Sequence, residues 1–215
     1  MSKAPRFYLI SDRRRMGSDP IAAILRLAAA GLPAFQWREK DLPAQDSHRF
    51  LQKLIAELRD AGAPTQVIVN DRVDIALALG IGVHIPEEGL PTRVARALLG
   101  PDALIGRSTH SLEAARSARD DGADFVTFSP VYDTASKRIY GPPQGLEMLR
   151  LVARELGPFP VIALGGVTAA RAQECMEAGA AGVAGIGAVW EAGDPVEVFR
   201  SFARTLLLVG GEHSL

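Results

Sequence analysis

Short apolar runs, many of them rich in β-branched residues, alternate with longer stretches of helical periodicity along the whole chain. The apolar runs have the length of strands, whereas the longer stretches repeat their apolar positions with the period of an amphipathic helix. A nearly continuous apolar run such as 160–164 indicates a strand buried on both faces, which is typical of a parallel sheet covered by helices. The predicted strands are Phe7–Ser11, Ala34–Arg38, Gln66–Asn70, Gly82–Ile85, Ala103–Gly106, Asp124–Phe128, Pro160–Leu164 and Gly182–Ile186. The predicted helices are Pro20–Ala30, Asp46–Ala61, Val73–Leu79, Pro91–Leu99, Leu112–Asp121, Leu146–Glu155, Ala169–Ala178 and Pro195–Leu208.

Eight strand–helix units predict an α/β protein folded as a single-domain (β/α)8 barrel, the TIM barrel. A doubly wound open sheet is the alternative. It is disfavoured because no G-x-G-x-x-G turn follows the first strand and no linker divides the chain. We expect the barrel to span residues 1–209 and residues 210–215 to form a flexible C-terminal tail. Asp19 and Asp194, each followed by proline, are predicted N-caps.

The composition fits a globular protein with ample material for one core: of 215 residues, 47% are hydrophobic and 23% are charged. The net charge of -1 gives no basic field, so we expect neither nucleic acid nor a membrane surface as a partner. The partners we expect are small molecules, with a homo-oligomer left open. Cys175, the single cysteine, lies in a helical pattern and is predicted to be a core residue. The apolar stretch before Ser11 is too short for a signal peptide or a membrane span, which favours the cytoplasm.

Active sites of barrels form at the C-terminal ends of the strands, so polar residues there are candidates for function. After the second strand, alternation sends Gln36, Arg38 and Lys40 to one side and Trp37 and Glu39 to the other. One amide and two cations would then line the mouth. A barrel-lining salt bridge of Arg38 is an equally open interpretation.

The third, fourth and fifth strands end in further polar residues. Asn70 and Asp71 follow the third strand, where Asp71 is either a helix cap or a metal ligand. His84 and His110 are interpreted as hydrogen-bonded structural residues, because no His or Cys partner stands at the spacing of a zinc site. Ser111 is a predicted N-cap.

A long loop follows the sixth strand and carries Thr134, Ser136 and Lys137. Its hydroxyls, lysine and turn residues suggest a closing flap that brings Lys137 to an anion. A solvated surface loop is the alternative.

Glycine-rich turns follow the seventh and eighth strands, at Gly165 and Gly166 and over Gly185–Ala188. These two turns are the recurrent phosphate site of this barrel, and glycine lets a phosphate approach backbone amides. A single pair of glycines is equally typical of a tight turn. Two such turns in adjacent units favour a phosphate site.

The order and spacing of these motifs resemble the thiamine phosphate synthase family. The matching motifs are Gln36-Trp-Arg38-Glu-Lys40, Asn70-Asp71, Gly-Val-His84, Ser108-Thr-His110-Ser, Ser-Pro130-Val-Tyr-Asp-Thr134-Ala-Ser136-Lys137, Ala-Leu-Gly165-Gly166-Val and Gly-Val-Ala-Gly-Ile-Gly-Ala. The resemblance covers the first strand to the eighth. It implies a transferase of thiamine biosynthesis that joins hydroxymethylpyrimidine diphosphate to hydroxyethylthiazole phosphate, releases diphosphate and uses Mg2+.

The same resemblance implies roles for individual residues. Diphosphate would be held by Arg38, Lys40, Asn70 and Lys137, and magnesium by Asp71. The pyrimidine would be addressed by Gln36 and Ser108, and the thiazole phosphate by Gly165, Gly166, Gly185, Ile186, Gly187 and Ala188. Thr134 and Ser136 would lie on the flap between the two substrates. The residues expected to act in catalysis are Arg38, Lys40, Ser108 and Lys137.

The chain departs from this family after His84. The family usually has Gly-Gln-x-Asp there, with the aspartate as the second magnesium ligand, whereas this chain has Pro86-Glu87-Glu88-Gly89. We therefore predict Glu88 as the second metal ligand.

Other functions stay open. The related thiazole tautomerases also lack that aspartate, but they place an acid/base histidine where this chain has Pro130. A non-catalytic barrel that binds thiazole or thiamine phosphates is a further alternative. Phosphate-binding barrels of tryptophan or histidine biosynthesis are disfavoured because their carboxylate and lysine patterns are absent.

Overall fold

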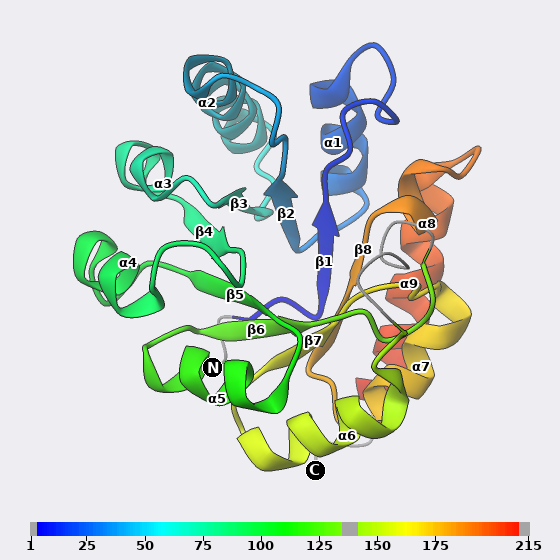
Figure 1. Ribbon diagram of the computed structural model, residues 1–215. Helices are drawn as coiled ribbons and strands as arrows, with labels where there is room; N and C mark the ends of the chain where they lie inside the picture. Colours follow the sequence, from blue (N-terminus) through cyan, green and yellow to red (C-terminus); the bar gives the residue numbers. More distant parts are fainter. Residues whose placement is uncertain (1–3, 135–141, 211–215) are drawn as a thin grey trace.

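The computed structural model describes residues 4–134 and 142–210, with side chains as far as residue 207. Eight parallel strands form a closed barrel in sequence order, and β8 pairs with β1. Helices surround it (Figure 1). The strands are β1 (Phe7–Ile10), β2 (Ala34–Trp37), β3 (Gln66–Asn70), β4 (Gly82–Ile85), β5 (Ile105–Thr109), β6 (Phe125–Phe128), β7 (Val161–Ala163) and β8 (Gly182–Gly185). The helices are α1 (Pro20–Ala29), α2 (Ala44–Asp60), α3 (Val73–Leu79), α4 (Thr92–Leu99), α5 (Leu112–Asp120), α6 (Gly145–Leu156), α7 (Ala169–Glu177), α8 (Gly187–Trp190) and α9 (Pro195–Gly210).

Alternation along each strand divides the core into two layers. On β1, Tyr8 and Ile10 point into the barrel, whereas Phe7 and Leu9 face the surrounding helices. The inner layer is a small cluster that fills the barrel, and the larger outer layer lies between strands and helices. The residues of the inner layer are Tyr8, Ile10, Ala34, Ile68, Leu104, Phe125, Ile162 and Ala184.

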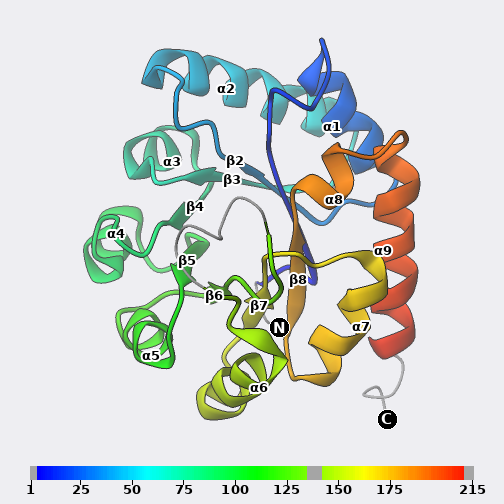
Figure 2. The same ribbon diagram turned by 45° about the vertical axis from the view of Figure 1, so that its right-hand side comes forward.

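The last helix closes the structure onto the first strand. Figure 2 shows α9 alongside α7, with which it is in contact. Phe199 and Phe202 of α9 pack on Phe7 with ring centroids 5.4 and 4.8 Å away, and Arg6 donates a hydrogen bond to the Leu206 carbonyl at 2.9 Å. Among the described residues, no helix combines the length and the apolar character that a membrane span requires.

The closed sheet confirms the predicted barrel and excludes the open sheet. Most predicted boundaries agree with the structure to within one or two residues, and the predicted caps are present. Asp19 accepts a hydrogen bond from the Ala22 amide at 3.1 Å, and Ser111 accepts one from the Ala114 amide at 3.1 Å. Helix α9 continues to Gly210, and residues 211–215 of the predicted tail lie outside the described residues.

The prediction for the fifth strand was wrong in position, because β5 covers Ile105–Thr109 rather than Ala103–Gly106. Its polar end belongs to the sheet: Arg107, Ser108 and Thr109 pair with residues of β6. A search for apolar runs misses such a segment, since its pairing partners rather than its own hydrophobicity make it a strand. The short helix α8 was also not predicted.

Cys175 is buried in α7, as predicted. Burial raises the pKa of its thiol to about 11, so the thiolate is scarce near neutral pH. The residue acts as a core side chain.

Candidate active site at the mouth of the barrel

A buried polar group interrupts the apolar filling of the barrel below its mouth. Gln36 of β2 is 1% exposed, and its Nε2 donates a hydrogen bond to the Tyr8 hydroxyl at 2.7 Å. The Gln36 Oε1 atom is buried and accepts no hydrogen bond in the described part of the chain. A buried acceptor without a donor is costly, so its retention indicates a role in binding a donor group of a ligand.

The Tyr8 ring also lies beside His84 of β4, with ring centroids 5.7 Å apart. His84 contacts Ser108 of β5, with His84 Nε2 and Ser108 Oγ 3.0 Å apart. Burial, and secondarily the charges of Arg38 and Arg107, lower the pKa of His84 to about 3, so the ring is neutral at physiological pH. His84 Nδ1 has no partner among the described residues. Nε2 also lies 3.4 Å from the Thr127 hydroxyl, so the ring contacts two hydroxyl groups and holds Ser108 in place beside it.

Gly106 of β5 makes room for this arrangement. A Cβ atom there would lie 2.4 Å from Phe125 Cζ and 2.5 Å from His84 Nδ1. The barrel thus accommodates both rings only because this position has no side chain. The prediction of His84 as a hydrogen-bonded structural residue is confirmed.

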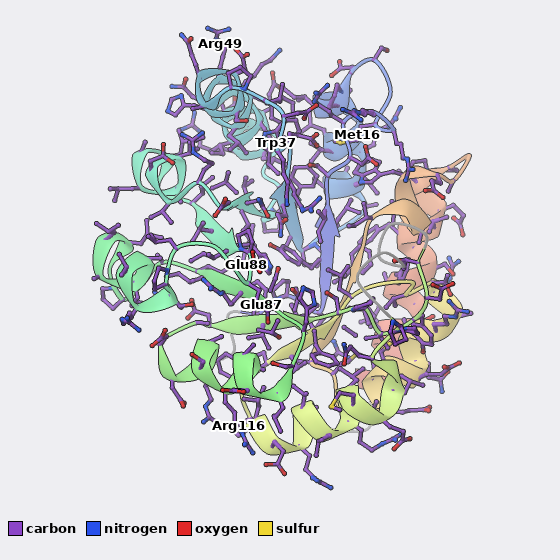
Figure 3. All side chains as sticks on the ribbon, viewed as in Figure 1. Met16, Trp37, Arg49, Glu87, Glu88 and Arg116 are labelled. Carbon is purple, nitrogen blue, oxygen red and sulfur yellow. The ribbon has the colours of Figure 1, made fainter. Side chains whose placement is uncertain are left out.

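The predicted alternation of side chains along β2 is present up to Trp37, where the strand ends. Trp37 points outward, stacks on Phe50 with centroids 3.8 Å apart, and is labelled in Figure 3. Glu39 accepts hydrogen bonds from the Ser11 hydroxyl at 2.5 Å and the Arg13 amide at 3.0 Å. The outer carboxylate therefore ties β2 to the end of β1.

Arg38 and Lys40 have no counter-charge among the described residues. Neither has a carboxylate within ion-pair distance in the described ranges 4–134 and 142–210. Arg38 is half-buried and close enough to His84 to affect its pKa, whereas Lys40 is exposed. The alternative of a barrel-lining salt bridge of Arg38 was wrong for these residues, and both cations are available to an anionic ligand.

Asp71 follows β3 in a left-handed conformation with φ of 65°. Its amide donates to the His84 carbonyl at 2.9 Å, and its exposed carboxylate makes no hydrogen bond or ion pair with a described residue. The alternative role as a helix cap was wrong, because α3 has Arg72 at its N-cap position and no side-chain cap. Asn70 lies beside it at the end of β3, half-buried. A non-glycine residue in this conformation is uncommon and is often found at functional sites.

The loop after β4 brings Gly89 against this carboxylate, since a Cβ atom at Gly89 would lie 3.0 Å from Asp71 Oδ1. Figure 3 labels the two glutamates of this loop. Glu87 Oε1 accepts from the His110 amide at 3.1 Å, and Arg107 donates to the Glu87 carbonyl at 2.5 Å. Glu88 is exposed, and its role as a metal ligand stays a prediction.

The predicted flap is only partly described. Thr134 Oγ1 is buried and has no hydrogen-bond partner in the described part of the chain. Ser136 and Lys137 lie outside the described residues.

The two glycine-rich turns contain amides that have no hydrogen-bond partner among the described residues. Those of Gly166, Val167 and Gly187 donate no hydrogen bond to any described residue. Gly165 and Gly166 have φ of 97° and 67°, and Cβ atoms there would lie 2.7 Å from Pro130 and from Tyr132 Cβ. Glycine is thus required by the close approach of the loop after β6, in addition to the predicted access for phosphate.

The second turn includes the remaining predicted phosphate-binding residues. It runs from Gly185 at the end of β8 into α8, and a Cβ atom at Gly187 would lie 2.9 Å from Glu191 Oε1. Ile186 packs against both layers of the core, and Ala188 is half-buried beside it.

Two features of the mouth were not predicted. Tyr8 lies in an apolar run and gave no polar signal, although the inward alternation of β1 could have revealed it. The arginines 13–15 form ion pairs at the mouth, among them Arg13 with Asp41 at 2.6 Å and Arg15 with Glu191. Their position directly after β1 was the available signal.

Comparison with known proteins agrees with this geometry. The family described as thiamine monophosphate synthase matches residues 7–189. A putative thiamine-phosphate synthase of Geobacter sulfurreducens is 47% identical over 93% of this chain and 92% of its own. The thiamine-phosphate synthase of a Roseiflexus species is 42% identical over 90% of this chain and 82% of its own. The structure of a thiamine phosphate pyrophosphorylase from Pyrococcus furiosus is 31% identical, with a TM-score of 0.85 over 96% of this chain and 97% of that one. The chain therefore belongs to the thiamine monophosphate synthase family.

Proposed function

We propose that this chain is a thiamine phosphate synthase, a transferase that joins hydroxymethylpyrimidine diphosphate to hydroxyethylthiazole phosphate and releases diphosphate. One observation carries the proposal for a chain of this family. Arg38 and Lys40, without a counter-carboxylate among the described residues, lie at the same mouth as the unpaired amide oxygen of Gln36. A diphosphate needs cations, and an aminopyrimidine needs a buried acceptor for its amino group.

The pyrimidine diphosphate would occupy the half of the mouth formed by β2 to β5. Gln36 Oε1 would accept from the amino group, and the Ser108 hydroxyl, held by neutral His84, would donate to the same substrate. Arg38, Lys40 and Asn70 would hold the diphosphate, joined by Lys137 from the flap. A neutral His84 suits the task of holding Ser108, because a charged imidazole inside the barrel would be strongly desolvated.

The thiazole phosphate would lie across the turns after β7 and β8. The free amides of Gly166, Val167 and Gly187 would donate to its oxygens, with Gly165, Gly185, Ile186 and Ala188 completing the two turns. Thr134 and Ser136 on the flap would lie between the two substrates.

The residues present fit a magnesium ion that is shared with the substrate. The described residues contain no group of three or more His, Cys, Asp or Glu that could hold a metal. Asp71 offers one unpaired carboxylate, and one or two carboxylates plus phosphate oxygens and water are a usual set for Mg2+. Glu88 is the proposed second carboxylate, direct or through water. When bound, the ion would stabilise the negative charge of the diphosphate.

In the reaction, the bond between the pyrimidine methylene carbon and the diphosphate oxygen breaks, and its electron pair leaves with diphosphate. Arg38, Lys40 and Lys137 would stabilise this charge as it grows. The thiazole nitrogen then donates its lone pair to the methylene carbon. The apolar barrel and the flap would exclude water, which would otherwise capture the carbocation. No protein nucleophile is required.

The decisive experiment incubates the purified chain with both substrates and Mg2+ and measures diphosphate and thiamine phosphate together. We expect equal amounts of the two products, and neither when one substrate is omitted. Arg38→Met should lower kcat/KM about a hundredfold, the range expected when a charged hydrogen bond is lost. Arg49→Met is the matched control, because Arg49 lies on α2 and its ion pair among the described residues is with Asp46, 3.8 Å away. Figure 3 labels it.

Other outcomes would identify a different function. Isomerisation of a thiazole carboxylate phosphate without diphosphate release would identify a tautomerase, which the synthase names of the relatives do not favour. Binding of both phosphates without turnover would identify a non-catalytic barrel. The proposal includes a cytoplasmic location and small phosphorylated molecules as partners. Analytical sedimentation of the purified chain would test whether copies associate.

A further inference from the structure

Tyr132 joins three parts of the molecule next to the predicted phosphate site. It lies on the loop after β6, shortly before Thr134, and its amide donates to the Gly165 carbonyl at 2.9 Å. Its hydroxyl donates to Glu174 Oε2 of α7 at 2.8 Å. The guanidinium of Arg171, also on α7, lies 4.5 Å from the centre of the Tyr132 ring. The loop, the glycine turn and α7 are thereby connected through one residue, whose amide contacts the turn and whose side chain contacts α7.

Arg171 makes a second contact with the glycine turn. Its Nη1 donates to the Gly166 carbonyl at 2.9 Å. It forms no ion pair with a carboxylate in the described ranges, since Glu174 is engaged by Tyr132. The cation therefore contacts an aromatic face and a backbone carbonyl.

These contacts fix the direction of the free amides. A trans peptide is planar, and its carbonyl and its N–H point in opposite directions. Holding the Gly165 carbonyl therefore sets the direction of the Gly166 N–H, and holding the Gly166 carbonyl sets that of the Val167 N–H. Glycine has no side chain to restrict these peptide planes, so without the two contacts the turn would sample other orientations.

We propose that Arg171 and Tyr132 are positioning residues for the thiazole phosphate. They hold the peptide planes of the turn after β7 so that its amides converge on the phosphate, and they tie this turn to the described part of the loop after β6. The inference deepens the proposed function and rests on it for the identity of the phosphate compound.

The test compares Arg171→Met, Arg171→Lys and the control Arg154→Met. Arg154 is an arginine of the neighbouring α6, 72% exposed, whose ion pair is with Glu155. Binding of hydroxyethylthiazole phosphate and, separately, of inorganic diphosphate is measured by calorimetry, alongside kcat, both KM values and the melting temperature. A charged hydrogen bond and its ordering effect correspond to about a tenfold change in affinity.

We expect Arg171→Met to weaken thiazole phosphate about tenfold in Kd and KM while the Kd of diphosphate and the melting temperature stay near those of the parent. Arg171→Lys should recover most of the loss, and Arg154→Met should change neither affinity. Tyr132→Phe, which keeps the ring and the amide contact and removes only the hydroxyl, should change the Kd by less than Arg171→Met does.

Three results would overturn the inference. These are an unchanged thiazole phosphate affinity in Arg171→Met, a parallel loss of both affinities with a lower melting temperature, and no rescue by lysine. A parent protein that binds no thiazole phosphate would also overturn it. A parent that binds thiazole phosphate but makes no thiamine phosphate would refute the proposed function alone, because the binding comparison would still stand.

Discussion

Replacing Gly166 by alanine should destabilise the protein more than the same change at Gly62, a glycine with a similar positive φ. Gly166 has φ of +67° and a Cβ atom there would lie 2.7 Å from Tyr132 Cβ and 3.0 Å from the Asp133 carbonyl oxygen. Gly62, at the end of α2, has φ of +64° and nothing within 4 Å of the corresponding position. Comparing the two variants separates the free-energy cost of a positive φ from the cost of the close contact that the new Cβ atom would make.

The magnitudes follow from these two environments. A non-glycine residue in the left-handed region costs about 1 to 2 kcal/mol, and both variants incur this cost. Forcing a methyl group into filled space costs about 1 to 3 kcal/mol, and only Gly166→Ala incurs it. The opposing atoms are a Cβ and backbone, which cannot swing aside as the end of a long side chain can. We therefore expect Gly166→Ala to lower the free energy of unfolding by about 1 to 3 kcal/mol more than Gly62→Ala does.

Equilibrium unfolding in urea, followed by tryptophan fluorescence and circular dichroism, measures this difference. The slopes of the transitions should agree between the variants, so that the midpoints report stability alone. Equal midpoints for Gly166→Ala and Gly62→Ala would refute the reasoning, since the loop after β6 would then not fill the space beside the turn. Gly166→Ala should in addition weaken thiazole phosphate, because the amides of the turn would shift.

Three further predictions concern charge. Lys137→Ala should lower kcat more than it raises KM, as measured by steady-state kinetics, because its charge would be used when the flap closes; an unchanged kcat would contradict this role. Asp71→Asn should nearly abolish activity, whereas Glu88→Gln should raise the Mg2+ concentration for half activity, and unchanged magnesium curves for both variants would refute these ligands. His84 has a folded-state pKa of about 3, below its usual value of 6.5, so its neutral form contributes stability that is fully present above pH 6.5 and lost as the pH falls towards 3. Between pH 6.5 and 3, lowering the pH by one unit should reduce the free energy of unfolding of the parent by up to about 1.4 kcal/mol more than that of His84→Gln. Parallel pH profiles of the two proteins would contradict the low pKa of His84.

The architecture was predictable because a parallel barrel buries both faces of its strands. Such strands appear as short apolar runs between amphipathic helices. Eight strand–helix units that repeat without a linker were then enough to predict a closed barrel. β5 shows the limit of this signal. Arg107, Ser108 and Thr109 belong to the strand through their pairing with β6, and pairing between distant segments leaves no periodic pattern in the sequence.

The part of the site that could be predicted consists of residues at the ends of strands. Arg38, Lys40 and Asp71 follow strand ends, and barrels place these ends at one mouth. The contacts of Tyr132 with Arg171 and Glu174 were not predictable, because they depend on the relative position of a loop and a helix about 40 residues apart. For the same reason the sequence predicted glycines 165 and 166 for phosphate access but did not reveal the loop that packs against them.

The buried polar residues of the barrel connect stability with binding. Gln36 Oε1 and His84 Nδ1 are both buried without a hydrogen-bond partner in the described part of the chain, and such groups cost about 1 to 3 kcal/mol each. Apolar residues of similar size would avoid this cost in an otherwise hydrophobic interior. The Gln36 amide nevertheless donates to the Tyr8 hydroxyl and leaves its own oxygen as an acceptor, whereas His84 contacts Ser108 and has its Nδ1 against Gly106. A ligand whose amino group meets the Gln36 Oε1 acceptor recovers the cost of that atom on binding, so the atom that weakens the free protein favours a heteroaromatic amine.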